Sequence, residues 1–210
     1  MRTAFLLFVV FTTAAFSTIR IVDGTGAGLA TNRFAKLSEA VTAASAGDTV
    51  LFLPGVYKEG ESVSIDKKLI ILGSGYRNVE NGGTHLYTSL ALGPNADNSK
   101  ISGIRFVGYG ISKNATDYVT VSNNLFMSSG TISSDGAVGD TIRNNIFLGG
   151  WISYTYNVGI INCVIANNIF RGPGGATYAI TVNSVSSISN LQVLNNIVTS
   201  YSTLIYNAWE

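Results

Sequence analysis

A short pattern of apolar and polar positions recurs through the second half of the chain. In each copy an apolar residue and a variable one precede two asparagines, and one or two apolar residues follow. Four copies have this form, namely Val121–Phe126 (VSNNLF), Ile142–Phe147 (IRNNIF), Ile165–Phe170 (IANNIF) and Val193–Val198 (VLNNIV), and Ile101–Phe106 (ISGIRF) is a weaker fifth. The second asparagines, at positions 124, 145, 168 and 196, are 21, 23 and 28 residues apart. Repeats of this length are typical of a solenoid, in which each repeat buries its apolar side against its neighbours.

Each repeat is predicted to hold three short strands, because β-branched and aromatic residues gather in runs of two to five. The second strand runs into the Asn-Asn pair, and the third is the Leu-Phe or Ile-Phe that follows. The first strand carries an apolar residue and a hydroxyl residue, found at Ile111-Ser112, Ile132-Ser133, Ile152-Ser153 and Ile180-Thr181.

The asparagine pairs are interpreted as structural. Consecutive strands of a coil must turn within one or two residues, and asparagine tolerates the left-handed backbone conformation better than any residue except glycine. Gly103 stands at the aligned position of the weaker repeat. Stacked coils would also bring equivalent amides to about the strand spacing of 4.8 Å, which suits a hydrogen-bonded ladder. The residues assigned to this turn ladder are Asn123, Asn124, Asn144, Asn145, Asn167, Asn168, Asn195 and Asn196.

Before the repeats, the apolar spacing predicts one amphipathic helix, from about Arg33 to Ala44. Phe34, Leu37, Val41 and Ala44 follow the spacing of a single helical stripe. Short strands are predicted around this helix, at Ile19–Val22, Thr49–Leu53, Val56–Tyr57, Val63–Ile65 and Leu69–Leu72.

Three segments of this region resemble the opening of a known family. They are Phe34–Ala40 (FAKLSEA), Gly47–Glu59 (GDTVLFLPGVYKE) and Val63–Gly73 (VSIDKKLIILG). Together they are similar to right-handed parallel β-helix proteins of the pectin-lyase-like superfamily. The resemblance implies an all-β fold, a right-handed parallel β-helix of three-strand coils, in which the amphipathic helix caps the first coil. It also implies a link to polysaccharides, since pectinesterases and pectate lyases belong to that superfamily.

Residues 1–17 have the features of a secretory signal peptide. Arg2 supplies a positive charge, Ala4–Phe11 is an apolar run, and Ala15–Ser17 is a small-residue cleavage site. The run is too short for a membrane-spanning helix. A secreted or cell-surface protein is therefore expected, with residues 18–210 forming one β-helix domain and no membrane span after cleavage.

The charge balance sets two classes of partner aside. Only 12% of the 210 residues are charged, and the formal net charge is +1. A nearly neutral chain without a basic run offers no electrostatic attraction to nucleic acid or to an anionic membrane.

Cysteine and histidine each occur once, as Cys163 and His85. A disulfide framework is excluded, and a zinc site or a Ser-His-Asp triad would have to use His85 itself. Cys163 is expected to be a small buried hydrophobe. No cofactor and no metal site are predicted, although calcium would suit a pair of acids.

The catalytic motifs of the superfamily are missing or incomplete. Arg171-Gly-Pro starts like the Arg-x-Pro-x-x-Arg motif of pectate lyases, but Ala176 stands in place of the second arginine. The remaining weak candidates for catalysis are Asp117, Asp135, Asp140 and Arg143. Paired carboxylates could provide acid–base chemistry or hold calcium, and arginine could neutralise a uronate. Such acids are more often solvated turn residues, and an outward arginine on a β-surface usually serves solubility.

A cluster of aromatic residues, Trp151, Tyr154, Tyr156 and Tyr178, falls on or beside the first strand of two successive coils. Rings in a row could stack on sugars. By alternation, however, Ile152, Tyr154 and Tyr156 share a face, so some of these rings are expected to pack inside.

The sequence thus favours a polysaccharide-binding or scaffolding module. A polysaccharide lyase or glycoside hydrolase and a structural or adhesive module are the alternatives. Thr203–Asn207 repeats the first strand of a coil shortly before Glu210. Since an open coil exposes unpaired backbone groups, either a missing C-terminal region or end-to-end self-association is expected to cover it.

Overall fold

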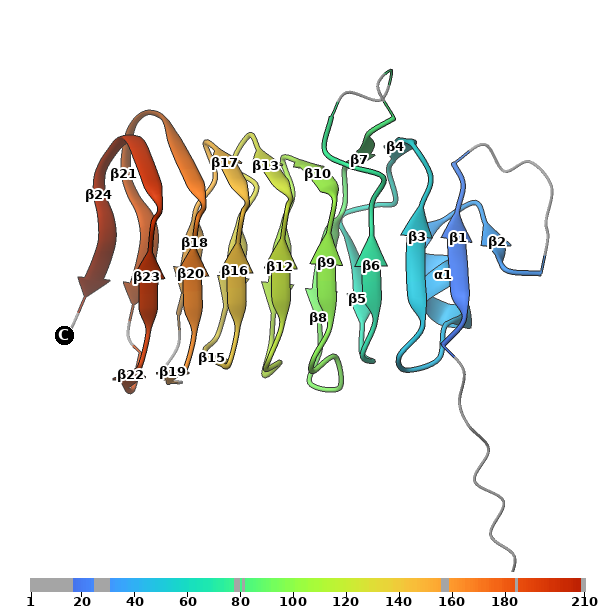
Figure 1. Ribbon diagram of the computed structural model, residues 1–210, viewed down its shortest axis with the longest axis horizontal. Helices are drawn as coiled ribbons and strands as arrows, with labels where there is room; N and C mark the ends of the chain where they lie inside the picture. Colours follow the sequence, from blue (N-terminus) through green and yellow to red (C-terminus); the bar gives the residue numbers. More distant parts are fainter. Residues whose placement is uncertain are drawn as a thin grey trace, which may run out of the picture.

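The computed structural model describes residues 17–24, 31–77, 80, 82–155, 159–183 and 185–208. These residues wind into a stack of coils along one axis, with the helix at one end and the last strand at the other (Figure 1). The predicted signal peptide lies outside the described residues, except for Ser17. Among the described residues, no helix has the length and apolar character needed to cross a membrane.

All the strands pair in parallel, in two long sheets that run along the stack and a short one in the later coils. A nine-stranded sheet holds β2 (Arg33–Phe34), β1 (Ile19–Val22), β3 (Thr49–Phe52), β6 (Ile70–Leu72), β9 (Lys100–Ser102), β12 (Thr120–Ser122), β16 (Thr141–Arg143), β20 (Val164–Ala166) and β23 (Gln192–Leu194). A three-stranded sheet holds β15 (Ala137–Val138), β19 (Ile160–Ile161) and β22 (Ile188–Ser189).

A twelve-stranded sheet has two limbs. The first limb contains β4 (Gly55–Tyr57), β7 (Thr84–Leu86), β10 (Ile104–Val107), β13 (Leu125–Met127) and β17 (Ile146–Leu148). The second limb contains β5 (Ser62–Ile65), β8 (Ser89–Leu92), β11 (Ile111–Lys113), β14 (Ile132–Ser134) and β18 (Ile152–Tyr154). The long strand β21 (Ile169–Asn183) joins the limbs, and β24 (Ile197–Ala208) pairs with it. The predicted parallel β-helix is confirmed.

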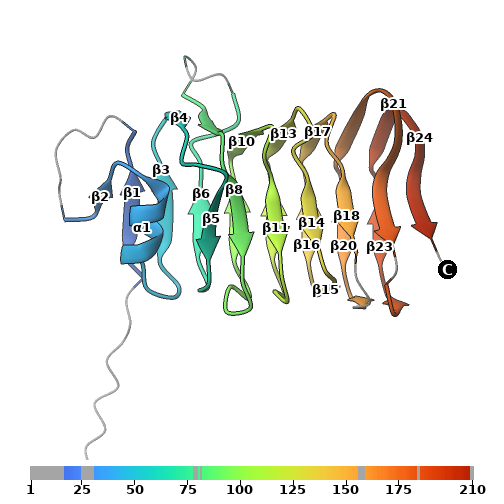
Figure 2. The same ribbon diagram turned by 180° about the vertical axis from the view of Figure 1, so that it is seen from behind.

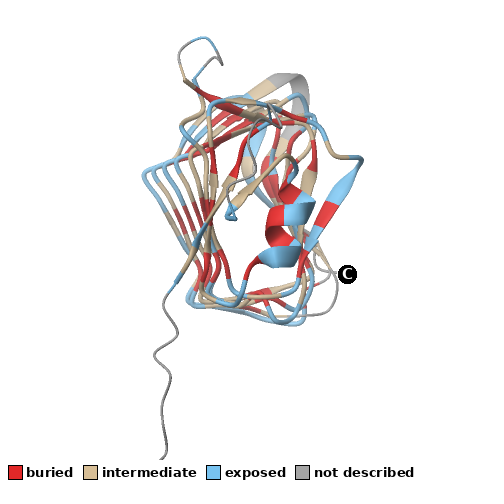
Figure 3. Cartoon of the chain, turned by 90° about the vertical axis from the view of Figure 1, so that its right-hand side faces the viewer, coloured by how far each residue is buried: buried red, intermediate tan, exposed pale blue. Residues whose placement is uncertain are grey.

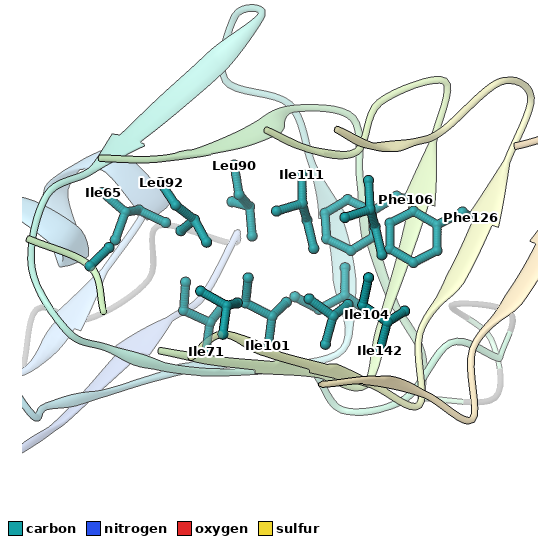
Figure 4. Close-up of a cluster of buried hydrophobic side chains, with 14 of the residues drawn as sticks. Ile65, Ile71, Leu90, Leu92, Ile101, Ile104, Phe106, Ile111, Phe126 and Ile142 are labelled. Atoms are coloured by element: carbon teal, nitrogen blue, oxygen red, sulfur yellow. The ribbon is translucent and has the colours of Figure 1, made fainter. Parts of the chain in front are cut away.

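Apolar side chains from the facing sheets fill the interior in columns, one residue per coil (Figure 4). Alternation along each strand sends one residue inward and its neighbours outward. The nine-stranded sheet contributes the buried column Ile71, Ile101, Val121, Ile142 and Ile165. The first limb contributes four phenylalanines, stacked with centroids 4.6 to 4.9 Å apart, at Phe106, Phe126, Phe147 and Phe170.

The helix is shorter than the sequence predicted. Helix α1 spans Leu37–Ala43, whereas Arg33 and Phe34 form β2 and pair with β1. The start of the helix is set by Glu59, whose carboxylate accepts hydrogen bonds from the backbone N–H groups of Leu37 and Ser38. Helix α1 lies over the end of the first coils (Figure 3), where its residues Leu37, Ala40 and Val41 are buried.

A buried carboxylate ties the start of the chain to the first coils. The side chain of Asp48 accepts hydrogen bonds from the backbone N–H groups of Thr18 and Ser45, at 2.8 and 2.9 Å, and from Arg20 Nε at 3.2 Å. Burial raises the pKa of Asp48, but these hydrogen bonds and the charge of Arg20 outweigh burial. The pKa therefore lies below its ordinary value of 3.8.

We expect Asp48→Asn to remove part of the acid sensitivity of folding. Near the ordinary pKa the unfolded chain binds more protons at this site than the folded chain. The stability contributed by Asp48 is therefore present above pH 3.8 and is lost as the pH falls through the lower pKa of the folded state. Urea unfolding at a series of pH values should show a shallower acid loss in the variant. Glu39→Gln, in an exposed position of α1, is the control, and equal profiles for the Asp48 variant and the unsubstituted chain would contradict the assignment.

Strands β23 and β24 form the end of the stack opposite α1 (Figure 2). Apolar side chains are exposed on both strands. Ile197 of β24 is 58% exposed, more than Ile169 (40%) and Leu125 (9%) at the equivalent positions of earlier coils, and Leu194 of β23 is 48% exposed. Within the described part of the chain, β24 pairs with β21 alone.

Candidate functional site

The outward side of the second limb carries a row of small, mostly hydroxyl side chains. Strand register places them side by side, one per coil, at Ser64, Ala91, Ser112, Ser133, Ser153 and Thr181. We call this surface the hydroxyl face. The residues that flank each of them in the strand point inward and are mostly apolar, which fixes the direction of the row. Thr181 Oγ1 donates a hydrogen bond to Ser153 Oγ at 3.1 Å.

A groove of about 310 Å³ lies on the hydroxyl face. Ser64, Ser112 and Ser133 line it together with Asn114 and Asp135. Its lining therefore combines hydrogen-bonding groups with apolar surface from Ala91 and Leu92.

A loop borders this groove at Gly93 and is fixed by a carboxylate. Asp66 accepts hydrogen bonds from the backbone and side-chain N–H groups of Asn95, at 3.0 and 2.9 Å. These bonds lower the pKa of Asp66, so the loop is held by an ionised side chain at neutral pH. One wall of the groove is thus preformed.

Aromatic rings extend the hydroxyl face toward the last coils. Trp151 precedes the inward-facing Ile152 on β18 and is 36% exposed. Tyr178 and Tyr206 stack on each other with centroids 4.1 Å apart, and Tyr206 is in register with Thr181. Tyr206 was not among the rings proposed from the sequence. Its position directly after Ile205, in a segment that repeats the first strand of a coil, would have indicated that it points outward.

One of the four rings proposed from the sequence does not take part. Tyr154 is 1% exposed and points into the interior with Ile152, so its assignment to a sugar platform is wrong. The reason is alternation, which points Ser153 of β18 and the preceding Trp151 outward, and Ile152 and Tyr154 inward. Tyr156 lies outside the described residues.

The four weak catalytic candidates are spread over separate parts of the coil. Asp135 lies at the groove, and its backbone N–H bonds to the carbonyl of Lys113 at 3.4 Å. Arg143 is exposed on β16 of the nine-stranded sheet. Asp117 accepts a hydrogen bond from the backbone N–H of Val138 at 3.1 Å, beside the three-stranded sheet.

Asp140 is buried inside the coil, where its carboxylate contacts Lys113 Nζ. A side chain in this position cannot reach a sugar on the outer surface. Its assignment as a surface acid or base is therefore wrong, and Asp135 is the one acid among the four that lines the groove.

Cys163 and His85 occupy unrelated positions. Cys163 is fully buried, and burial raises the pKa of its thiol. His85 lies on the first limb, with Nε2 2.9 Å from the carbonyl of Arg77. The described residues contain no group of three or more His, Cys, Asp or Glu side chains suited to a metal ion.

The two asparagines of each repeated pair have different roles. The first takes the left-handed conformation, with φ of 56° at Asn123, Asn144 and Asn167, and of 52° at Asn195. Gly103 has φ of 76° at the equivalent corner. The first asparagine therefore makes the bend between the nine-stranded sheet and the first limb.

The second asparagine of each pair forms the ladder. Asn145 Oδ1 accepts hydrogen bonds from the backbone N–H and from Nδ2 of Asn124, at 3.0 and 3.2 Å. Asn145 Nδ2 in turn donates to Asn168 Oδ1 at 3.1 Å, and Asn168 donates to Asn196 in the same way. Asn124, Asn145 and Asn168 are fully buried, which makes them structural rather than ligand-binding.

Comparison of the chain with protein-family models, with curated proteins and with solved structures gave no match.

Proposed function

We propose that the protein is a secreted or cell-surface module that binds a polysaccharide along its hydroxyl face. The observation that carries the proposal is the combination, on one outward surface, of a hydroxyl row, a polar groove and the exposed rings of Trp151 and Tyr206. The carbohydrate class comes from the resemblance of residues 34–73 to the pectin-lyase-like superfamily.

The chemistry of this surface suits a sugar chain. A pyranose offers hydroxyl groups around its rim and C–H groups on its faces. The rim can exchange hydrogen bonds with Ser112, Ser133 and Asn114, while the faces can pack on aromatic rings. Because the hydroxyls recur at about the strand spacing of 4.8 Å, a glycan lying along the coil axis would meet similar groups at each coil. Once one sugar is bound, the next sugars of the same chain are held at a high effective concentration near the following coils, so several weak contacts together give a higher affinity.

A uronic acid polymer is the less favoured substrate class for this face. Asp135 would repel its carboxylates, and Arg143 faces another side of the coil. Neutral polysaccharides are therefore the first ligands to test.

Paired arginine substitutions test the location of the site. Ser133→Arg places a large charged side chain in the groove, whereas Ser122→Arg places it on the outward side of the nine-stranded sheet. Affinity electrophoresis in gels containing neutral and acidic polysaccharides should show retardation of the unsubstituted chain and of the Ser122 variant. The Ser133 variant should lose at least tenfold in affinity. Equal retardation of both variants would contradict the proposed face.

Aromatic substitutions test the stacking contribution. We expect Trp151→Ala and Tyr206→Ala to weaken retardation, and Tyr118→Ala to leave it unchanged. Tyr118 is a matched control because it is 52% exposed but lies beside the three-stranded sheet. Retardation that survives loss of both rings would remove the aromatic part of the proposal. Release of shortened or unsaturated sugars from the same polysaccharides would favour a lyase or hydrolase instead.

A further inference from the structure

The interior of the coil contains one lysine and one aspartate in direct contact. Lys113 is the last residue of β11 and points inward, in register with Leu92 and Ser134. Asp140 lies just before β16, and its Oδ2 contacts Lys113 Nζ. The two side chains are 2% and 3% exposed. Such a pair is unusual, because two charges removed from water lose more hydration energy than an average contact returns.

The surroundings of Asp140 disfavour its charged form. Burial raises the pKa of Asp140, and the negative charge of Asp117 raises it further; Lys113 and the backbone N–H of Val119 act in the opposite direction, and burial prevails. Tyr154 and Cys163 are also buried beside Asp140, and the Tyr154 hydroxyl has no hydrogen-bond partner. The neutral carboxyl is therefore favoured at Asp140.

We propose that Lys113 and Asp140 condense into an intramolecular isopeptide bond. In its unprotonated form, Nζ of Lys113 donates its lone pair to Cγ of Asp140 and forms the C–N bond. A proton from the nitrogen then passes to Oδ2, and the C–Oδ2 bond breaks so that this oxygen leaves as water. One amide and one water replace one amine and one carboxylic acid, with no oxidant, cofactor or further reactant.

The geometry supports each part of this step. The backbone N–H of Val119 donates to Asp140 Oδ1 at 2.9 Å, which orients the carboxyl and places a donor where negative charge develops during the attack. Oδ2, the oxygen that leaves, is the one facing Lys113 Nζ. Holding the two groups in contact inside a packed core supplies the high effective concentration that condensation requires.

The bond would join coils that are separated in sequence. It would connect the end of β11 with the turn before β16 and close a covalent loop from residue 113 to residue 140. The coils between these residues could then not be pulled apart without breaking an amide. This role suits a module exposed outside the cell, but the inference does not depend on glycan binding.

Intact mass spectrometry of the purified full chain tests the proposal. A proteolytic digest of the same sample identifies the two ends of the chain, so that the expected mass is known. The chain should be lighter than its sequence by one water. Asp140→Asn should be lighter than its own sequence by one ammonia, because its amide can undergo the same attack and give the same product. Lys113→Arg and Asp140→Ala should have their full sequence masses. A digest of the unsubstituted chain should yield a branched peptide containing both residues.

The outcomes are decisive even if the control variants fold poorly. A folded, unsubstituted chain with its full sequence mass, and with Lys113 and Asp140 recovered in separate peptides, would overturn the proposal and leave a buried ion pair. A mass loss that persists in Lys113→Arg would place the modification elsewhere and overturn it as well. Equal masses of the unsubstituted chain and Asp140→Asn would support it without reference to the other variants.

Discussion

Replacing Asn145 by alanine is expected to lower the free energy of unfolding by about 3 kcal/mol, because a central position of the buried ladder is lost. The backbone N–H of Asn124 loses its acceptor, Asn145 Oδ1, in a site closed to water. Asn145 Nδ2 also donates to the carbonyl of Val121 at 2.9 Å and to Asn168 Oδ1. The loss combines one unsatisfied buried donor with several missing hydrogen bonds. Urea unfolding followed by circular dichroism measures it.

The neighbouring Asn144 provides a matched control of the same residue type. Its side chain is exposed, and its backbone has φ of 56°. Asn144→Gly should change the stability by less than about 1 kcal/mol, since glycine adopts this conformation freely. Asn144→Ala should cost about 1 to 2 kcal/mol, because of its left-handed backbone. If Asn144→Gly destabilised the chain as much as Asn145→Ala, the division of roles within the pair would be wrong.

Phe147→Ala is expected to cost about 3 to 5 kcal/mol, the usual range for removing a buried phenylalanine. Phe147 is fully buried and stacks on two rings, with centroids 4.7 Å from Phe126 and 4.6 Å from Phe170. Its removal leaves a cavity in the middle of the column and interrupts the stack. For a domain of this size the midpoint of thermal unfolding should fall by about 10 °C.

Two substitutions separate loss of volume from other effects. Phe147→Leu keeps most of the apolar volume and should cost less than the alanine variant. Leu148→Ala changes the next residue, which points outward and is half-buried, so it should cost less still. A loss in Leu148→Ala equal to that in Phe147→Ala would argue against the interior column as the main source of stability.

The repeated pattern was sufficient to predict the coil. Each copy has, in the same order, an apolar residue that points inward, an asparagine or glycine at the corner, and a second apolar residue that points inward. The sequence also showed that Trp151 and Ser153 point to one side of the strand and Ile152 and Tyr154 to the other. Because Ile152 points inward, Tyr154 is the ring that is buried. These features depend on neighbouring residues, which is why the sequence alone could reveal them.

Other features depend on residues far apart in the chain. Phe34 fits the stripe of a helix, but the helix begins at Leu37 because the carboxylate of Glu59 caps it there. The contact of Lys113 with Asp140 crosses the interior between coils, so neither residue carries a local sign of the other. The hydroxyl residues of the first strands were already visible in the repeats, whereas the groove beside them, which also includes Asn114 and Asp135, depends on how the coils stack.

The corner between the two limbs accommodates chain length. From Phe147 to Ile152 the chain takes 5 residues, whereas from Phe170 to the equivalent Ile180 it takes 10. These five additional residues account for the increase in the repeat from 23 to 28, while the strands on both sides keep their register. Peptide segments could therefore be grafted at this corner, or acquired there during evolution, without any change to the asparagine ladder or to the phenylalanine column.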